Sequence, residues 1–481
     1  MTALAQRPRA MLSLLLALSV AVGASWDCAM LARSRGWPAI AIPLASRSTD
    51  TADGTPAERV EMKRGEARGG PGSAAEERIT YVESMGIGRI AVLVRTPDTP
   101  RYPEGAPVVV SCSGFFVPFV GFHEGLDTTR IGAIYVSYLW PGRSDPRSGA
   151  QSDGEYDHGG AIGLAALRDV IRFATGEIPD VDGHYLHDSA SITPLYSVSG
   201  LYAFSHSGIV GTNVLCLHGE ELSNVSFFIG RENPTVDALY PLEPGHFTDL
   251  RQPVANPFYD PSGYTPTTVS IDYSTVYWLE SDECPEGRPA FAVAGGQDYV
   301  CSAKHPQLWD KDYWSTDLLQ ALLDNGALTR EQWPRRLATP EEAAEHWPFR
   351  TTVDNYPRLA EVLPELRVML VFAAGDHVQS AVDKPHIHHA YDGFHHRAGL
   401  WCRMNPDRAY AEALLGSGQG NALPDNPANA EPSDWMAVGA WGYRAPQGSP
   451  LHVLIPLAAV AEMCDRTYHD NWSDDLTAAL P

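Results

Sequence analysis

Positively charged residues are scarce in this sequence. Its 481 residues include 35 lysines and arginines against 59 aspartates and glutamates, which gives a formal net charge of −24 at pH 7. No basic patch offsets this imbalance, and a surface so acidic repels nucleic acid and anionic membranes. We therefore expect no nucleic-acid partner and, once an N-terminal signal is cleaved, no membrane partner.

The N-terminus lacks an apolar run long enough for a comfortable membrane span. Residues 11–22 are apolar, whereas a spanning helix needs about 20 such residues. Two arginines precede the run and the small-residue triplet Val-Gly-Ala closes it, which is the order typical of a secretory signal. We therefore expect a signal peptide over residues 1–24 and a secreted or periplasmic protein. An uncleaved N-terminal anchor is the alternative.

Cysteine is infrequent too. The chain has seven cysteines, and because the number is odd, at least one is unpaired within the chain. An oxidising compartment would permit disulfides. We expect one bridge between Cys284 and Cys301 and another between Cys402 and Cys464.

What the sequence does contain is an alternation of strand-like and helix-like segments. Residues 159–176 place apolar side chains at helical spacing, which predicts an amphipathic helix. A strand, a helix and another strand follow in the same way. This alternation predicts the α/β class, with a mostly parallel twisted sheet and helices on both faces. The first β-branched and aromatic runs are residues 78–84, 88–97, 106–114 and 131–140.

The alternation stops near residue 231 and resumes near residue 366. The intervening segments are rich in proline and aromatic residues, so an inserted cap region explains them better than more sheet. Residues 42–76 have the composition of a flexible linker. The predicted organisation is a signal peptide (1–24), a flexible N-terminal segment (25–76), a first core part (77–230), an insertion or cap (231–363) and a second core part (364–481).

The sequence AFSHS, residues 203–207, separates a predicted strand from a predicted helix. A serine hydroxyl is a poor nucleophile at neutral pH, so it needs a base, an acid that orients the base, and donors for the oxyanion. On a nucleophile elbow the positions two before and two after the serine must be small. Centring the turn on Ser205 places Ala203 and Ser207 there. Centring it on Ser207 places the β-branched Ile209 there, so we favour Ser205 and keep Ser207 as the alternative.

Over residues 78–230 and 366–376 the chain resembles the α/β-hydrolases. Its sequence pattern is most similar to that of the dienelactone-hydrolase-like and prolyl-oligopeptidase-like esterases and peptidases. The resemblance implies an α/β-hydrolase fold with backbone donors for the oxyanion. The N–H of His206 is one implied donor and that of Phe115, after the third predicted strand, is the other. Where the family has histidine in a His-Gly turn, this chain has Ser113.

The acid of this family follows the seventh strand. Asp376 ends the apolar run that begins at residue 366, and the carboxyl edge of such a sheet is where sites gather. We therefore expect Asp376 to orient the base. An aspartate that caps a helix is the alternative interpretation.

The base is harder to assign from the sequence. The resemblance would place a histidine after the eighth strand, but the sequence there reads Asn405-Pro406-Asp407. His452 lies at a loop-to-helix transition after the last predicted strand, and we favour it. His386 and His469 remain candidates.

Two segments raise the question of a metal site. In residues 386–389, HIHH, two histidines three apart could share a helix face, but no carboxylate or cysteine is fixed beside them, which favours a solvated face. Residues 180–188, DVDGHYLHD, resemble a fragment of a calcium loop, but Asp-Gly pairs mostly mark turns. We expect no metal and no other cofactor.

The features together favour a secreted serine hydrolase with Ser205, His452 and Asp376 as its triad. It would cleave a carboxylic ester, or an amide, of a small-molecule or peptide substrate through an acyl-enzyme. The alternative is a non-catalytic binding protein of the same fold that has lost the histidine. The aromatic residues expected to shape an apolar pocket are Tyr273, Tyr277, Trp278, Trp309 and Trp314.

Overall fold

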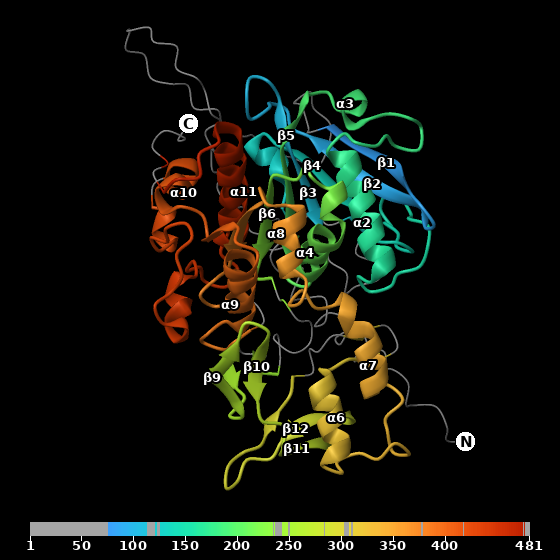
Figure 1. Cartoon of the computed structure of the whole chain (residues 1–481), viewed down its shortest axis with the longest axis vertical. Coiled ribbons are helices and arrows are strands. Elements are labelled where there is room, and N and C mark those ends of the chain that lie inside the picture. Colours follow the sequence, from blue (N-terminus) through green and yellow to red (C-terminus); the bar gives the residue numbers. More distant parts are fainter. Residues whose placement is uncertain are drawn as a thin grey trace, which may run out of the picture.

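A mixed eight-stranded sheet forms the centre of the protein. Its strand order is β1-β2-β4-β3-β5-β6-β16-β17. Strand β2 is antiparallel to both of its neighbours, and all the other neighbouring pairs are parallel. The strands are β1 (Glu76–Ser84), β2 (Gly88–Thr96), β3 (Ala106–Cys112), β4 (Ile134–Tyr138), β5 (Pro194–Phe204), β6 (Phe227–Arg231), β16 (Arg367–Val371) and β17 (Trp401–Met404). The computed structural model (Figure 1) describes residues 76–112, 121–122, 126–233, 235, 243–248, 251–282, 284–302, 307–308, 311–376, 379–416, 418–474 and 476.

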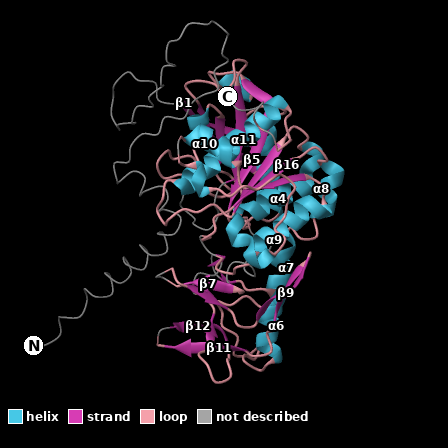
Figure 2. Cartoon of the chain, turned by 90° about the vertical axis from the view of Figure 1, so that its left-hand side faces the viewer, coloured by secondary structure: helices cyan, strands magenta, loops and turns pink. Residues whose placement is uncertain are grey.

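Helices cover both faces of this sheet (Figure 2). One face carries α2 (Ala161–Ala174), α4 (Ser207–His218), α8 (Tyr356–Val362) and α9 (Pro385–Tyr391). The other carries η1 (Thr128–Ile131), α10 (Arg408–Leu415) and α11 (Leu451–His469). The predicted fold class is therefore confirmed. Short helical segments complete the core: α3 (Leu186–Ser189), η2 (Gly219–Glu221), η4 (Asp392–Arg397), η5 (Gly420–Ala422) and η6 (Trp435–Trp441).

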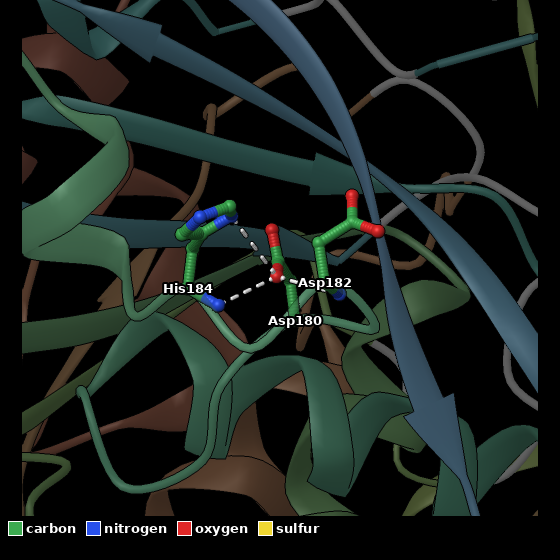
Figure 3. A group of neighbouring side chains, drawn as sticks. All are labelled: Asp180, Asp182 and His184. Atoms are coloured by element: carbon green, nitrogen blue, oxygen red, sulfur yellow. Dashed lines mark hydrogen bonds and ion pairs between the residues drawn. The ribbon is translucent and has the colours of Figure 1, made fainter.

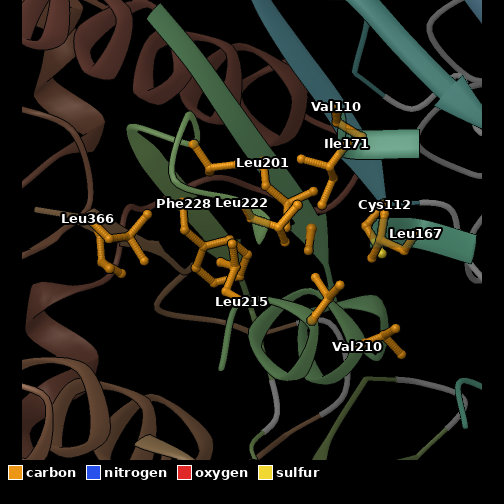
Figure 4. Packing of buried hydrophobic residues seen from close by; sticks show 14 of the residues in the cluster. Val110, Cys112, Leu167, Ile171, Leu201, Val210, Leu215, Leu222, Phe228 and Leu366 are labelled. Carbon is orange, nitrogen blue, oxygen red and sulfur yellow. The ribbon is translucent and has the colours of Figure 1, made fainter. Parts of the chain in front are cut away.

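The central strands are buried on both faces, because successive side chains of a strand point to opposite sides. In β5, Leu201 and Ala203 belong to the apolar cluster on the α4 side, and Tyr202 belongs to the cluster on the α11 side. Figure 4 shows the first cluster, in which Leu201 and Phe228 of the sheet lie near Leu215 of α4. Each large apolar side chain buried in this way stabilises the fold by roughly 2 kcal/mol.

Between β6 and β16 the described residues form small sheets of their own. They have a separate apolar cluster that includes Phe291, Trp314 and Leu318. Of the aromatic residues expected to shape a substrate pocket, Trp314 belongs to this cluster and Tyr273 and Trp278 pack against it, so these three build the interior of the insertion. The hydroxyl of Tyr277 instead donates to Asp298. Trp309 lies outside the described residues. The elements are β7 (Gly245–Phe247), β8 (Pro253–Ala255), β9 (Tyr259–Thr265), β10 (Thr268–Ile271), β11 (Val276–Ser281), β12 (Cys284–Phe291), β13 (Tyr299–Val300), β14 (Gln307–Leu308), β15 (Lys311–Asp312), α6 (Thr316–Asp324), α7 (Pro340–His346) and η3 (Trp347–Phe349).

The predicted signal peptide and linker lie outside the described residues. Among the residues that the structure does describe, no helix combines the length and apolar character of a membrane span.

The expected disulfides are corrected by the structure, because the cysteines in its described part are free. Cys402 of β17 belongs to the apolar cluster on the α4 side of the sheet, whereas Cys464 of α11 belongs to the cluster on the opposite side. The N–H of Cys301 donates to the carbonyl of Pro289 in β12 at 3.0 Å. Cys284 lies five residues before Pro289 on that strand, about 16 Å away at strand spacing. Neither pair can reach disulfide distance.

Candidate active site

Ser205 lies on a tight turn between β5 and α4. Strand β5 ends at Phe204 and α4 begins at Ser207. The φ angle of Ser205 is +58°, in the left-handed region, which costs a residue with a Cβ about 1–2 kcal/mol. Its N–H donates to the carbonyl of Arg231 at 2.8 Å, and its own carbonyl accepts from the N–H of Gly208 at 2.8 Å. The backbone strain of the turn therefore falls on Ser205, and Ser207 is the first helical residue.

Small residues let α4 approach the sheet behind this turn. Ala203, two residues before Ser205, is buried, and a Cβ built on Gly211 would lie 3.2 Å from the Ala203 Cβ. A Cβ on Gly208 would come within 1.6 Å of Asn233 Oδ1. The close packing of α4 therefore requires small residues on both sides of Ser205.

Asp376 lies beyond the end of β16, at the same edge of the sheet as Ser205. Only β6 separates β16 from β5, and two strand spacings amount to about 10 Å. The Asp376 side chain is buried, and its Oδ1 accepts from the N–H of Gln379 at 2.7 Å. Its Oδ2 lies 3.0 Å from Nε2 of His386.

The strand order, the strained serine after the fifth strand and the buried acid after the seventh appear in one molecule. The chain has the α/β-hydrolase fold. In this fold Ser205 lies on the turn between the fifth strand and the helix that follows it, and Asp376 lies just after the seventh strand.

His386 lies directly beside Asp376. It is the second residue of α9, and both side chains of the pair are almost completely buried. Lys384 precedes the helix with a φ of +40°, so the chain turns sharply before α9. From the sequence alone, His386 is only one of the two alternatives to His452.

His452, the histidine favoured from the sequence, lies in the first turn of α11. Its Nδ1 is 3.1 Å from the Tyr443 hydroxyl. Tyr443 pairs with Ala373 just beyond β16. His452 therefore lies near the edge of the sheet that carries Asp376.

His469, the third candidate, lies at the far end of α11. It lies 17 positions after His452 on this helix (469 − 452 = 17), about 26 Å away at the helical rise. Its neighbour Tyr468 stacks on Tyr102, which precedes β3 and so lies at the amino edge of the sheet. His469 is therefore on the wrong side of the sheet for Ser205.

Asn405 follows β17, where the resemblance would have placed a histidine. It is fully buried, and its side chain accepts from the N–H of Phe372 at 2.9 Å and donates to the carbonyl of Trp441 at 2.9 Å. These bonds join β16 to the segment before α11. Asn405 therefore has a structural role at this position.

Two buried charged residues that the sequence did not single out, Glu232 and Lys384, lie near Asp376. Glu232 follows β6 with a φ of +44°, and its Oε1 accepts from the N–H of Ala373 at 3.3 Å. The ammonium of Lys384 donates to the carbonyl of Gln379 at 2.9 Å. Burial lowers the pKa of Lys384, while Asp376 and Glu232 oppose that shift. An acidic residue directly after a buried strand was the sequence signal for Glu232.

Of the two expected oxyanion donors, His206 lies within the described residues. His206 follows Ser205 directly and precedes the first residue of α4. Phe115 lies outside the described residues.

The side chains of residues 180–188 and 386–389, the two segments considered for a metal site, take part in hydrogen bonds and ring stacking. Asp180, Asp182 and His184 lie close together (Figure 3). The Asp180 carboxylate accepts from the backbone N–H groups of Asp182 and His184, and these two bonds stabilise a turn. It also accepts from the Thr80 hydroxyl. On α9, the His386 ring faces Asp376 and the His388 ring is stacked between two aromatic rings. The histidines of HIHH therefore serve separate contacts.

Comparisons with solved structures find likeness at low sequence identity. An acylaminoacyl peptidase from Pyrococcus horikoshii is 11% identical with a TM-score of 0.38, over 85% of this chain and 44% of that one. An esterase from Rhizomucor miehei is 12% identical with a TM-score of 0.38, over 83% and 86%. Dipeptidyl peptidase 4 from Porphyromonas gingivalis is 12% identical with a TM-score of 0.33, over 69% and 31%. The chain thus spans less than a third of that peptidase. No protein-family model and no curated protein matches the sequence.

Proposed function

We propose that the protein is a serine hydrolase that cleaves a carboxylic ester, or an amide, through an acyl-enzyme. The observation that carries this proposal is the left-handed backbone of Ser205 between β5 and α4. Strain of this kind persists at functional sites, and here it presents a hydroxyl-bearing residue at the carboxyl edge of the sheet. The resemblance of the sequence to esterases and peptidases suggests the two substrate classes.

In this proposal Ser205 attacks the carbonyl carbon and a histidine takes its proton. The 3.0 Å approach of His386 to Asp376 supports His386 as that base, with Asp376 orienting the ring. The hydrogen bond from the Gln379 N–H holds the carboxylate in place. The position of His452 near the same edge supports it as the alternative base.

The tetrahedral intermediate needs donors for its oxyanion. We propose the backbone N–H of His206 and, from the resemblance, that of Phe115. Removing one such donor costs about 100- to 1000-fold in kcat in enzymes of this kind.

The first test is turnover of a chromogenic short-acyl ester by the full chain. Ser205→Ala should lower kcat/KM by at least about 1000-fold, because the nucleophile is removed. Ser207→Ala is the matched control and should stay within about tenfold of wild type. Loss of activity in Ser207→Ala with retention in Ser205→Ala would reverse the assignment.

The base is tested with His386→Gln and His452→Gln in the same assay. We expect His386→Gln to lose about 1000-fold or more in kcat and His452→Gln to lose far less. The opposite order would assign the base to His452. Retained activity in both variants would contradict a histidine base in either place.

A second candidate function rests on Asn405. Because this asparagine replaces the histidine of the family, the chain could be a binding protein of hydrolase fold. Absence of turnover with acyl esters and with peptide amides would favour that function. In either case we propose a secreted or periplasmic location, from residues 1–24.

A further inference from the structure

The segment that carries Asp376 and His386 is held by the insertion as well as by the sheet. The Arg251 guanidinium donates to the backbone carbonyl of Asp376 at 2.9 Å. The Ser380 hydroxyl donates to the carbonyl of Val254 at 3.3 Å. Both contacts join residues more than 120 positions apart in the sequence, so the place of this segment depends on how the insertion is docked.

The β9–β10 hairpin makes two specific contacts with α9 and the residues just before it, and the first of these is at Asp383. The Tyr259 hydroxyl, at the start of β9, hydrogen-bonds to the Asp383 carboxylate. Asp383 is buried and lies three residues before His386. Burial raises the pKa of Asp383, and the bond from Tyr259 opposes that rise. The contact therefore gives one oxygen of this buried carboxylate a hydrogen-bond donor.

The second contact is a stack of three rings across α9. The His388 ring lies between Tyr264 of β9, with ring centroids 3.5 Å apart, and Trp435 of η6, with centroids 3.8 Å apart. Both ring pairs are within 13° of parallel. Burial lowers the pKa of His388 to about 3, so the ring is neutral at the working pH of most enzymes. Tyr264 also meets His389 edge-on at 4.5 Å.

Figure 1 shows the hairpin beside α9, and Figure 2 shows β9 close to α9 from a second direction. Its two contacts fall on Asp383 and His388, which lie on either side of His386 in the sequence. The hairpin therefore fixes the backbone both before and after the residue that faces Asp376.

We infer that Tyr259 and Tyr264 are positioning residues that assemble the Asp376–His386 pair. The two side chains stay 3.0 Å apart while the β9–β10 hairpin is docked on α9, and they separate when the hairpin detaches. This inference rests on the proposed function for its catalytic consequence. A displacement of about 1 Å in such a pair can lower the rate about 100-fold.

Hydrogen–deuterium exchange of the full chain tests the docking without any activity. Tyr264→Ala should raise the exchange rate of the α9 amides at least tenfold and leave α6, inside the insertion, unchanged. Tyr264→Phe keeps the stacked ring and should exchange like wild type. Tyr277→Ala is the matched control, since the hydroxyl of this insertion tyrosine bonds to Asp298 within the insertion. Unchanged exchange in α9, or an equal rise in α6, would overturn the inference.

Ester turnover by the same variants tests the consequence for catalysis. Tyr264→Ala and Tyr259→Phe should lower kcat at least tenfold with little change in KM, and Tyr264→Phe should restore kcat. A change in KM alone would overturn the positioning role. An inactive wild type would refute the proposed function, whereas the exchange result decides the docking independently.

Discussion

At the scale of single residues, strain and proposed chemistry coincide at Ser205. Glycine adopts a positive φ without the steric cost that a Cβ brings. We therefore expect Ser205→Gly to have a free energy of unfolding about 1 kcal/mol above that of Ser205→Ala, although both variants lack the nucleophile. Urea unfolding of the two variants measures the difference. Equal stabilities would contradict a strained turn at this residue.

Glu243, inside the insertion, is a second residue with a measurable signature. Burial raises its pKa to about 7 from an ordinary value of 4.5, against the hydrogen bonds from Tyr273 and Ser315. The folded protein thus holds this proton more tightly than the unfolded chain. The resulting stabilisation is fully present below pH 4.5 and is lost as the pH rises through about 7.

We therefore expect the free energy of unfolding to fall between pH 5 and pH 8 by up to about 3 kcal/mol from this group. Glu243→Gln should remove most of that fall, because its amide does not titrate. Urea unfolding at several pH values, followed by tryptophan fluorescence, measures both proteins. A parallel pH dependence in wild type and variant would rule out a raised pKa at Glu243.

At the scale of elements, the close approach of α4 to the sheet depends on Gly208. A Cβ added at Gly208 would lie 2.8 Å from the Cβ of Asn233 and would overlap the amide group of that side chain. We expect Gly208→Ala to lower the free energy of unfolding by about 1–3 kcal/mol, despite the better helix propensity of alanine. Gly439→Ala is the control, since a Cβ there meets nothing within 4 Å. Equal effects in the two variants would contradict this packing.

Most core elements could be predicted from the sequence because they are buried on one or both sides. Strand β6 and helix α2, for example, have an apolar run or an apolar face that the local sequence reveals. The strands of the insertion could not, because they are short and largely exposed: β9 contains Pro261 and Gly263 and has no fully buried residue.

The candidate site was predictable where it depends on local backbone and unpredictable where it depends on long-range packing. The small residues around Ser205 predicted the tight turn, and the apolar run before Asp376 predicted that this carboxylate follows a buried strand. The approach of His386 to Asp376 depends on a hairpin about 120 residues earlier in the chain, with Tyr264 against His388. No local pattern around His386 or His452 carries that information.

At the scale of the whole molecule, the fold is held together without disulfides among its described cysteines. These cysteines are all buried. Burial raises the pKa of Cys112 and Cys216 to about 12, so the thiols of these two residues are unreactive in the folded state. We expect a reducing agent to leave the thermal unfolding midpoint unchanged, and a thiol reagent to modify these cysteines only after unfolding. A midpoint that drops by several degrees would reveal a disulfide, since removing one costs about 2–5 kcal/mol.

Ser205 is the residue on which the proposed hydrolase activity of the whole molecule depends. The most direct measurement is to treat the protein with a fluorophosphonate, which reacts covalently with activated serines, and to locate the adduct by peptide mass spectrometry. We predict a single adduct on Ser205 in wild type and in Ser207→Ala, and none in Ser205→Ala. An adduct on Ser207, or no adduct on the folded wild type, would contradict Ser205 as the nucleophile.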